Sequence, residues 1–159
     1  MASLLIITPV EKLQEKVNRI VKSYRNLPGV YVSLNKSQKS AESILKKSGI
    51  NTKKLFFIDC VTSEKVKDDV LHIAPTELDL LSTALASFMR DIKGEEFIII
   101  DELSTLLIYN SENKVARFVE KMTECASQHD THVVALSPRT RGEELLSKIF
   151  NFFDKVEGR

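Results

Sequence analysis

Cysteine is scarce in this sequence, and the few cysteines present exclude two classes of small protein. The 159-residue chain contains only Cys60 and Cys125. Their number and spacing provide neither a disulfide framework nor a four-ligand zinc site. We therefore expect a reducing, cytoplasmic setting for the protein.

The sequence also lacks long apolar runs and a strong charge of either sign. The first apolar run ends at Pro9 with no basic stretch before it, so it is too short for a signal peptide or a membrane span. A formal net charge of +1 predicts neither a nucleic-acid-binding surface nor attraction to a membrane for the chain as a whole. Length and a hydrophobic content of 43% predict one folded domain over residues 1–159.

Short apolar segments that alternate with amphipathic ones make up most of the chain. The segments predicted as strands are Leu4–Ile7, Val30–Leu34, Leu55–Ile58, Leu71–Ile73, Phe97–Ile100, Val133–Leu136 and Phe152–Val156. Helical spacing of apolar residues separates most of them. Continuously apolar strands that alternate with helices predict an α/β fold, a three-layer αβα sandwich with a mainly parallel central sheet.

Several local signals predict where helices start and where loops lie. Thr8 is expected to cap a helix that begins at Pro9, and Thr76 to Asp79 has the form of a capping box. Val61 to Val70 and Ser104 to Ser111 are predicted as loops. The apolar stretch from Leu106 to Tyr109 is either a protein-contact patch or part of the packing under its own helix.

Acidic residues follow two of the predicted strands. Asp101 and Glu102 come directly after Phe97–Ile100, and Asp59 follows Leu55–Ile58. In open α/β sheets, ligands bind beyond the carboxyl ends of the strands. These three carboxylates are therefore candidate ligands of a divalent metal or a nucleotide. The alternative is structural, with carboxylates that accept hydrogen bonds from neighbouring loops.

The order of these stretches resembles the RecA-like ATPase domains, most closely the archaeal RadA and KaiC type. The stretches are VYVSL, LFFIDCVTSE, HIAPTELDLLSTAL, FIIIDELSTLL and THVVALSP, and the likeness covers most of the chain. The resemblance implies that FIIID is the Walker B strand and that Asp101 would help to hold Mg²⁺. The final FFDKVEG resembles the next strand of the KaiC type, cut short.

The sequence departs from this family where phosphate binding and catalysis are expected. A phosphate-binding loop reads G-x-x-x-x-G-K-[ST], but TPVEKLQEKV follows Ile7 and no glycine lies between Met1 and Gly29. Asn35-Lys36 stands where the resemblance places the catalytic Glu, and an amide cannot act as a general base. Conventional ATP hydrolysis is therefore not expected, and no cofactor is predicted, with weak binding of Mg²⁺ and ATP as an alternative.

Basic residues provide further candidate contacts. Arg139 and Arg141 lie in a turn after Val133–Leu136, where they could reach the nucleotide of a neighbouring subunit or form a plain surface turn. A strip of lysines on and after the second helix could meet nucleic-acid phosphates, or be an ordinary solvated surface. It comprises Lys36, Lys39, Lys46, Lys47, Lys53 and Lys54.

A run of Cys125, His129 and His132 has the composition of a partial zinc ligand set, but no fourth ligand is evident nearby, and a structural role is the alternative. His72 is expected to be a partly buried structural residue.

The sequence favours a non-hydrolytic RecA/KaiC-like domain that acts as a protein-binding or regulatory module. Self-association and an active RecA-type ATPase are the partners that the resemblance implies. An atypical nucleotide-binding protein that uses Asp101 and Glu102 is the first alternative, and nucleic-acid binding through the lysine strip is the second.

Overall fold

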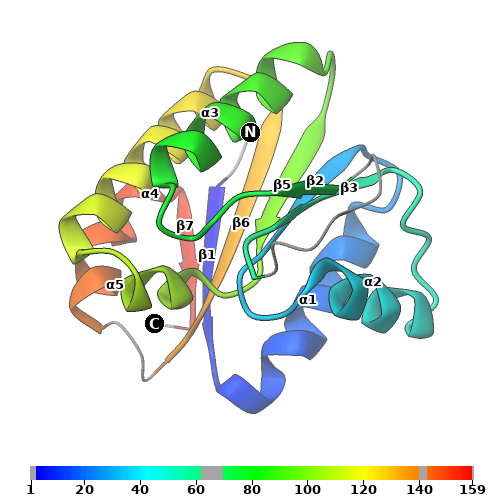
Figure 1. Ribbon diagram of the computed structural model, residues 1–159, viewed down its shortest axis with the longest axis horizontal. Coiled ribbons are helices and arrows are strands. Elements are labelled where there is room, and N and C mark those ends of the chain that lie inside the picture. Colours follow the sequence, from blue (N-terminus) through cyan, green and yellow to red (C-terminus); the bar gives the residue numbers. More distant parts are fainter. Residues whose placement is uncertain (1–2, 62–69, 140–142, 159) are drawn as a thin grey trace.

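The computed structural model describes residues 3–61, 70–139 and 143–158, and it contains one sheet between two layers of helices (Figure 1). The strand order is β4-β3-β2-β5-β6-β1-β7, and every pairing is parallel. The strands are β1 (Ser3–Thr8), β2 (Gly29–Ser33), β3 (Leu55–Asp59), β4 (Val70–His72), β5 (Glu96–Ile100), β6 (Thr131–Pro138) and β7 (Lys155–Glu157). The predicted α/β three-layer sandwich is confirmed.

Helices cover both faces of the sheet. The α-helices are α1 (Leu13–Ser23), α2 (Gln38–Lys47), α3 (Leu78–Asp91), α4 (Glu112–Ser127) and α5 (Glu143–Ile149), and the 3₁₀ helices are η1 (Val10–Lys12), η2 (Leu103–Ile108) and η3 (Phe150–Phe152). Figure 1 shows α1 and α2 on one side of the sheet and α3, α4 and α5 on the other. Among the described residues, no helix is long and apolar enough to cross a membrane.

Strand β5 lies at the centre of the sheet and divides the core in two. Phe97 and Ile99 pack with the residues under α1 and α2, whereas Ile98 and Ile100 pack under α3 and α4. All five residues of β5 are buried, as expected for a parallel strand that is covered on both faces. Strand β5 therefore contributes side chains to both hydrophobic clusters, one on each face of the sheet.

Two of the predicted helix starts are wrong. Thr8 is the last residue of β1, and its buried Oγ1 makes no cap bond. Pro9 keeps an extended ψ of 144°, so the chain forms η1 first and α1 begins only at Leu13. The expected capping box also fails, because α3 begins at Leu78 with Glu77 at its N-cap and no side-chain cap bond. Both signals depend on a single side-chain hydrogen bond, which neither helix start makes.

Helix α2 begins at Gln38, and Ser37 Oγ accepts the N–H of Ser40 at 3.2 Å. The stretch after β5, expected to be a loop, forms η2, which buries Leu106 and leaves Ile108 exposed. Most of the loop predicted over 61–70 lies outside the described residues, as does Arg141.

Gly29 provides a test of the packing between β2 and β5. A Cβ placed on Gly29 would overlap the ring of Phe97, which is 2% exposed and stacks on Tyr24, so the ring must shift within a packed core. We expect Gly29→Ala to lower the free energy of unfolding by about 1–3 kcal/mol, the usual effect of overfilling a packed core. Urea denaturation measures this change.

Gly49 supplies the matched control for this substitution. It has a φ of +80°, and no heavy atom lies within 4 Å of the position that a Cβ would take there. Gly49→Asn should therefore change stability by only about 0.5 kcal/mol, because Asn tolerates a positive φ. An equal loss in both variants would contradict the packing argument.

Candidate functional site

Asp101 lies at the carboxyl edge of the sheet, directly after β5. Its side chain is 1% exposed, and its Oδ1 accepts the Leu34 N–H at 2.8 Å while Oδ2 accepts the Tyr31 hydroxyl at 3.4 Å. Burial raises the pKa of Asp101 to about 6, against the opposing effects of the Leu34 N–H and the Lys36 charge. Asp101 is therefore largely ionised at neutral pH and connects β5 to the segment after β2.

Asp59 has a similar position at the end of β3. Its Oδ2 accepts the Gln38 N–H at 2.9 Å, and its Oδ1 accepts the Val61 N–H at 2.8 Å. One carboxylate thus holds both the first residue of α2 and the segment after β3. Burial, followed by the charges of Asp59 and Asp101, raises the pKa of the Cys60 thiol to about 12, so this cysteine is not an activated nucleophile.

Glu102 is 5% exposed and accepts a hydrogen bond from Thr105 Oγ1 at 2.8 Å within η2. Asp101 and Glu102 are the adjacent carboxylates that could hold a cation, yet each already accepts hydrogen bonds from the protein. Within the part of the chain that the structure describes, no three acidic, histidine or cysteine side chains gather into a possible metal site. Asp101, Glu102 and Asp59 therefore share an edge of the sheet without converging on one point.

The basic candidates are spread along the same edge. Arg139 follows β6, its side chain is exposed, and its backbone N–H donates to Thr8 O at 3.1 Å. Lys36 Nζ donates to Gln14 Oε1 at 2.8 Å, which directs it toward α1, whereas Lys39 is exposed on α2. Arg139 is thus near the end of β1, in the position that the sequence predicts for a contact at this edge.

The predicted lysine strip is divided in the structure. Lys39, Lys46 and Lys47 line a shallow groove of about 410 Å³ along α2, and no aromatic residue lines it. Lys46 lies 3.6 Å from Glu42, and Lys54 Nζ donates to Asn26 O at 3.2 Å. Three of the six lysines, Lys36, Lys46 and Lys54, therefore have partners within the protein.

Two residues of the predicted zinc run lie together, since Cys125 Sγ is 3.9 Å from His129 Nδ1, but His132 does not join them. His129 Nδ1 lies 2.8 Å from Cys125 O, at the end of α4. His132 Nε2 lies 2.9 Å from Glu95 Oε2, and its ring stacks on Tyr24 with 5.1 Å between centroids. Each histidine has a structural contact of its own. His72 is half-buried in β4, as predicted.

The chain after β1 offers few backbone donors. Pro9 has no N–H, and the N–H groups of Lys12 and Leu13 are already donated to the carbonyls of Pro9 and Val10. A phosphate-binding loop needs several N–H groups that point outward together. Two N–H groups of the backbone between β1 and α1 are therefore already bonded within this turn.

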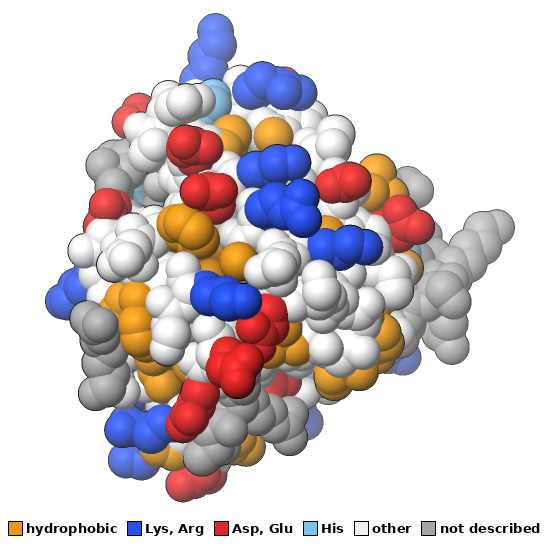
Figure 2. Space-filling model, turned by 90° about the vertical axis from the view of Figure 1, so that its left-hand side faces the viewer, with side chains coloured by type: hydrophobic (Ala, Val, Ile, Leu, Met, Phe, Trp, Pro, Cys, Tyr) orange, Lys and Arg blue, Asp and Glu red, His pale blue; other side chains and the backbone are white. Residues whose placement is uncertain are grey.

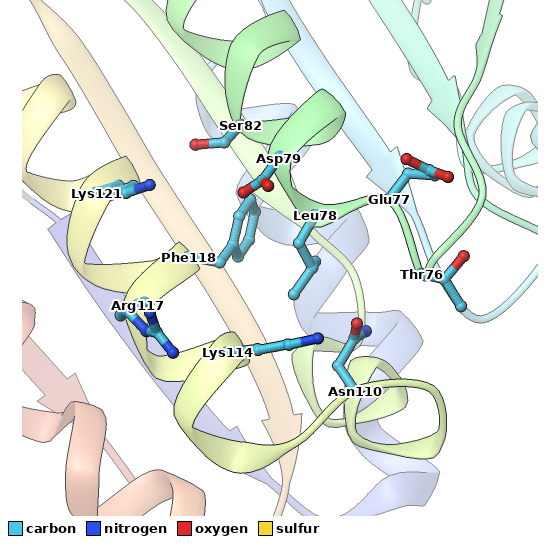
Figure 3. A pocket seen from close by; sticks show the side chains of 10 residues that line it. All are labelled: Thr76, Glu77, Leu78, Asp79, Ser82, Asn110, Lys114, Arg117, Phe118 and Lys121. Atoms are coloured by element: carbon cyan, nitrogen blue, oxygen red, sulfur yellow. The ribbon is translucent and has the colours of Figure 1, made fainter.

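Two further surface features are seen in the structure, and the sequence suggested only part of the first, through the candidate contact patch at Leu106 to Tyr109. Val10, Ile108 and Tyr109 are exposed by 55%, 69% and 51%, and all three follow the carboxyl ends of β1 or β5. A cleft of about 240 Å³ lies between the start of α3 and α4, and three basic residues of α4 line it (Figure 3). The spacing of these basic residues in the sequence could have revealed the second feature.

The structure resembles several solved archaeal structures. An uncharacterized Pyrococcus horikoshii protein, PH0321, crystallised in complex with an unknown peptide, has a TM-score of 0.74 and 14% identity, over 98% of this chain and 76% of its own. The KaiC-like protein PH0186 of the same organism has a TM-score of 0.66 and 12% identity, over 98% and 69%. The fold is RecA/KaiC-like.

A third structure supports the same conclusion about the fold. PH0250 from P. horikoshii has a TM-score of 0.64 and 11% identity, over 98% of this chain and 79% of its own. No protein-family model and no curated protein sequence matches the chain. At these identities the likeness shows the RecA/KaiC-like fold alone.

The raised pKa of Asp101 predicts a pH-dependent difference between the protein and its Asp101→Asn variant. The folded pKa of about 6 exceeds the ordinary 3.8, so the stabilising effect of protonated Asp101 is complete below about pH 4 and is lost as the pH rises through 6. Asparagine does not titrate. The free energy of unfolding of the wild-type protein, minus that of the Asp101→Asn variant, should therefore fall by about 3 kcal/mol or less between pH 4 and 7.

Urea denaturation of both proteins at several pH values measures this difference. Comparing them cancels the titration of groups that the substitution leaves unchanged. A difference that stays constant from pH 4 to 7 would show that Asp101 has an ordinary pKa.

Proposed function

We propose that the chain is a non-hydrolytic RecA/KaiC-like domain that binds a protein partner and regulates it. The observation that carries the proposal is the end of β1, where Pro9 and η1 replace a glycine-rich turn. Since the N–H groups of Lys12 and Leu13 are already bonded, this backbone has few donors left for a triphosphate.

The use of the acidic residues supports the same proposal. Asp101 accepts hydrogen bonds from Leu34 and Tyr31, and Asp59 accepts them from Gln38 and Val61. These carboxylates hold the segments that follow β2 and β3, which is a structural task. Binding Mg²⁺ through either carboxylate would compete with those hydrogen bonds.

The apolar side chains at the carboxyl edge support the protein-binding part of the proposal. Val10, Ile108 and Tyr109, which we call the apolar rim, are large and more than half exposed. Contiguous exposed apolar patches mark protein contact sites, and we propose that Ile108 and Tyr109, which are adjacent in the sequence, are the centre of one. The similar fold of PH0321 was crystallised with an unknown peptide, and we extend peptide binding to this chain as part of the proposal.

Calorimetric titration with Mg²⁺ and ATP tests the nucleotide side of the proposal. We expect no binding heat at millimolar ATP, because the phosphate-gripping backbone and the general base are both missing. Binding at micromolar ATP would overturn the proposal. It would favour the alternative, an atypical nucleotide-binding protein that uses Asp101, Glu102 and the basic turn containing Arg139.

Peptide-display selection against the protein tests the apolar rim. Selected peptides should lose at least about tenfold in affinity for an Ile108→Ser/Tyr109→Ser variant, since truncating central interface residues costs about 1 kcal/mol or more each. Leu71→Ser, at a 40% exposed position on β4, is the matched control and should retain binding. Equal binding by all three proteins would contradict a contact site at the rim.

A further inference from the structure

The charges of helix α4 are sorted onto two sides. Lys114, Arg117 and Lys121 line the cleft between α3 and α4, whereas Glu120 and Glu124 line a different pocket, near β6 and the end of the chain. Glu112 is paired with Lys148 of α5 at 3.0 Å. The side of α4 that faces α3 is therefore basic.

This grouping of like charges does not stabilise the folded domain. Lys114, Arg117 and Lys121 are three and four residues apart, so they are neighbours of like charge on one helix surface, which weakens a helix by about 0.2–0.5 kcal/mol per pair. All three are exposed, and none makes an ion pair with another described residue. In Figure 2, Lys and Arg side chains gather in the middle of this face, with acidic side chains on either side.

The opposite wall of the cleft is well fixed. Asn110 donates both of its amide hydrogens, to Pro75 O at 2.9 Å and to Leu106 O at 3.0 Å, which joins the segment before α3 to η2. Thr76 and Ser82 place hydroxyl groups along this wall, and Phe118 and Leu78 are the apolar residues between the two helices. A ligand would therefore meet a preformed cleft.

The acidic groups at the cleft are fewer than the basic ones. Figure 3 shows the Glu77 carboxylate directed away from α4 and the Asp79 carboxylate near the ring of Phe118. Asp79 would repel an anion, but three cations outweigh it. The cleft volume of about 240 Å³ is below the range of roughly 300–1,000 Å³ usual for drug-sized ligands, so a small anionic group fits better than a whole nucleotide.

We propose that the cleft between α3 and α4 binds a phosphate group through Lys114, Arg117 and Lys121. The guanidinium of Arg117 can donate two parallel hydrogen bonds to phosphate oxygens, and the two lysines supply further charge on either side of it. None of the apolar-rim residues lines this cleft, and phosphate binding there requires no hydrolysis. The phosphate belongs either to free inorganic phosphate or to a phosphorylated side chain.

Amide NMR titration of the whole chain with sodium phosphate tests the site, with sodium chloride at the same ionic strength as the reference. Phosphate should shift the resonances of the first turn of α3 and of Arg117. The affinity should fall about tenfold or more in a Lys114→Gln/Arg117→Gln variant, because charge-assisted hydrogen bonds are lost. Arg19→Gln/Lys22→Gln removes the same charge from exposed positions on α1 and should leave the affinity unchanged.

A substitution of Asp79 should have the opposite effect on phosphate affinity. Asp79→Asn should tighten phosphate binding about threefold by removing a repulsion. It should also slightly lower stability, since it removes an acidic residue from the first turn of α3. A merely structural effect of Asp79 would not increase affinity.

A phosphoserine peptide and its serine counterpart distinguish the two sources of phosphate. Tighter binding of the phosphoserine peptide than of inorganic phosphate identifies a phosphorylated protein as the source, and the reverse order identifies free phosphate. Three results would each overturn the proposal. Chloride could shift the amide resonances as much as phosphate does, the α1 control could lose as much phosphate affinity as the Lys114→Gln/Arg117→Gln variant, or Asp79→Asn could bind phosphate more weakly.

Discussion

Strand β5 is buried on both faces, and this burial determines which elements must surround it. Its side chains alternate between the two hydrophobic clusters, so helices must cover each face of the sheet. Parallel partners on either side satisfy its backbone through β2 and β6. The crossover helices follow from that requirement, because parallel neighbours need a connection that returns to the starting edge.

The same arrangement brings the strand ends to one edge and explains how the acidic residues are used. Asp59 and Asp101 follow buried strands, so their carboxylates enter a region of low polarity where they require hydrogen-bond donors. Backbone N–H groups of the segments after β2 and β3 provide them. The edge that holds ligands in many α/β folds is here partly occupied by the protein's own polar groups.

The surface is organised by the helices. Helix α4 directs its apolar residues toward the sheet, its cations toward α3 and its acids toward another pocket. The proposed phosphate cleft and the apolar rim are therefore consequences of where α3, α4 and η2 are placed on the sheet. Leu78 and Phe118 at the cleft belong to the core, but the charged and exposed side chains of both features do not, so those side chains can differ among proteins of this fold.

The sequence by itself determined the fold class, because strands such as Phe97–Ile100 are apolar throughout and alternate with helices of clear period. It also placed Asp101, Glu102 and Asp59 at one edge, since residues after parallel strands must meet there. Only the tertiary structure decided what their oxygens contact, that Thr8 and Thr76 cap no helix, and that His132 contacts Glu95 and does not join Cys125 and His129. Those outcomes depend on side-chain directions and on segments distant in sequence, such as Asn110 against Pro75, for which local periodicity contains no information.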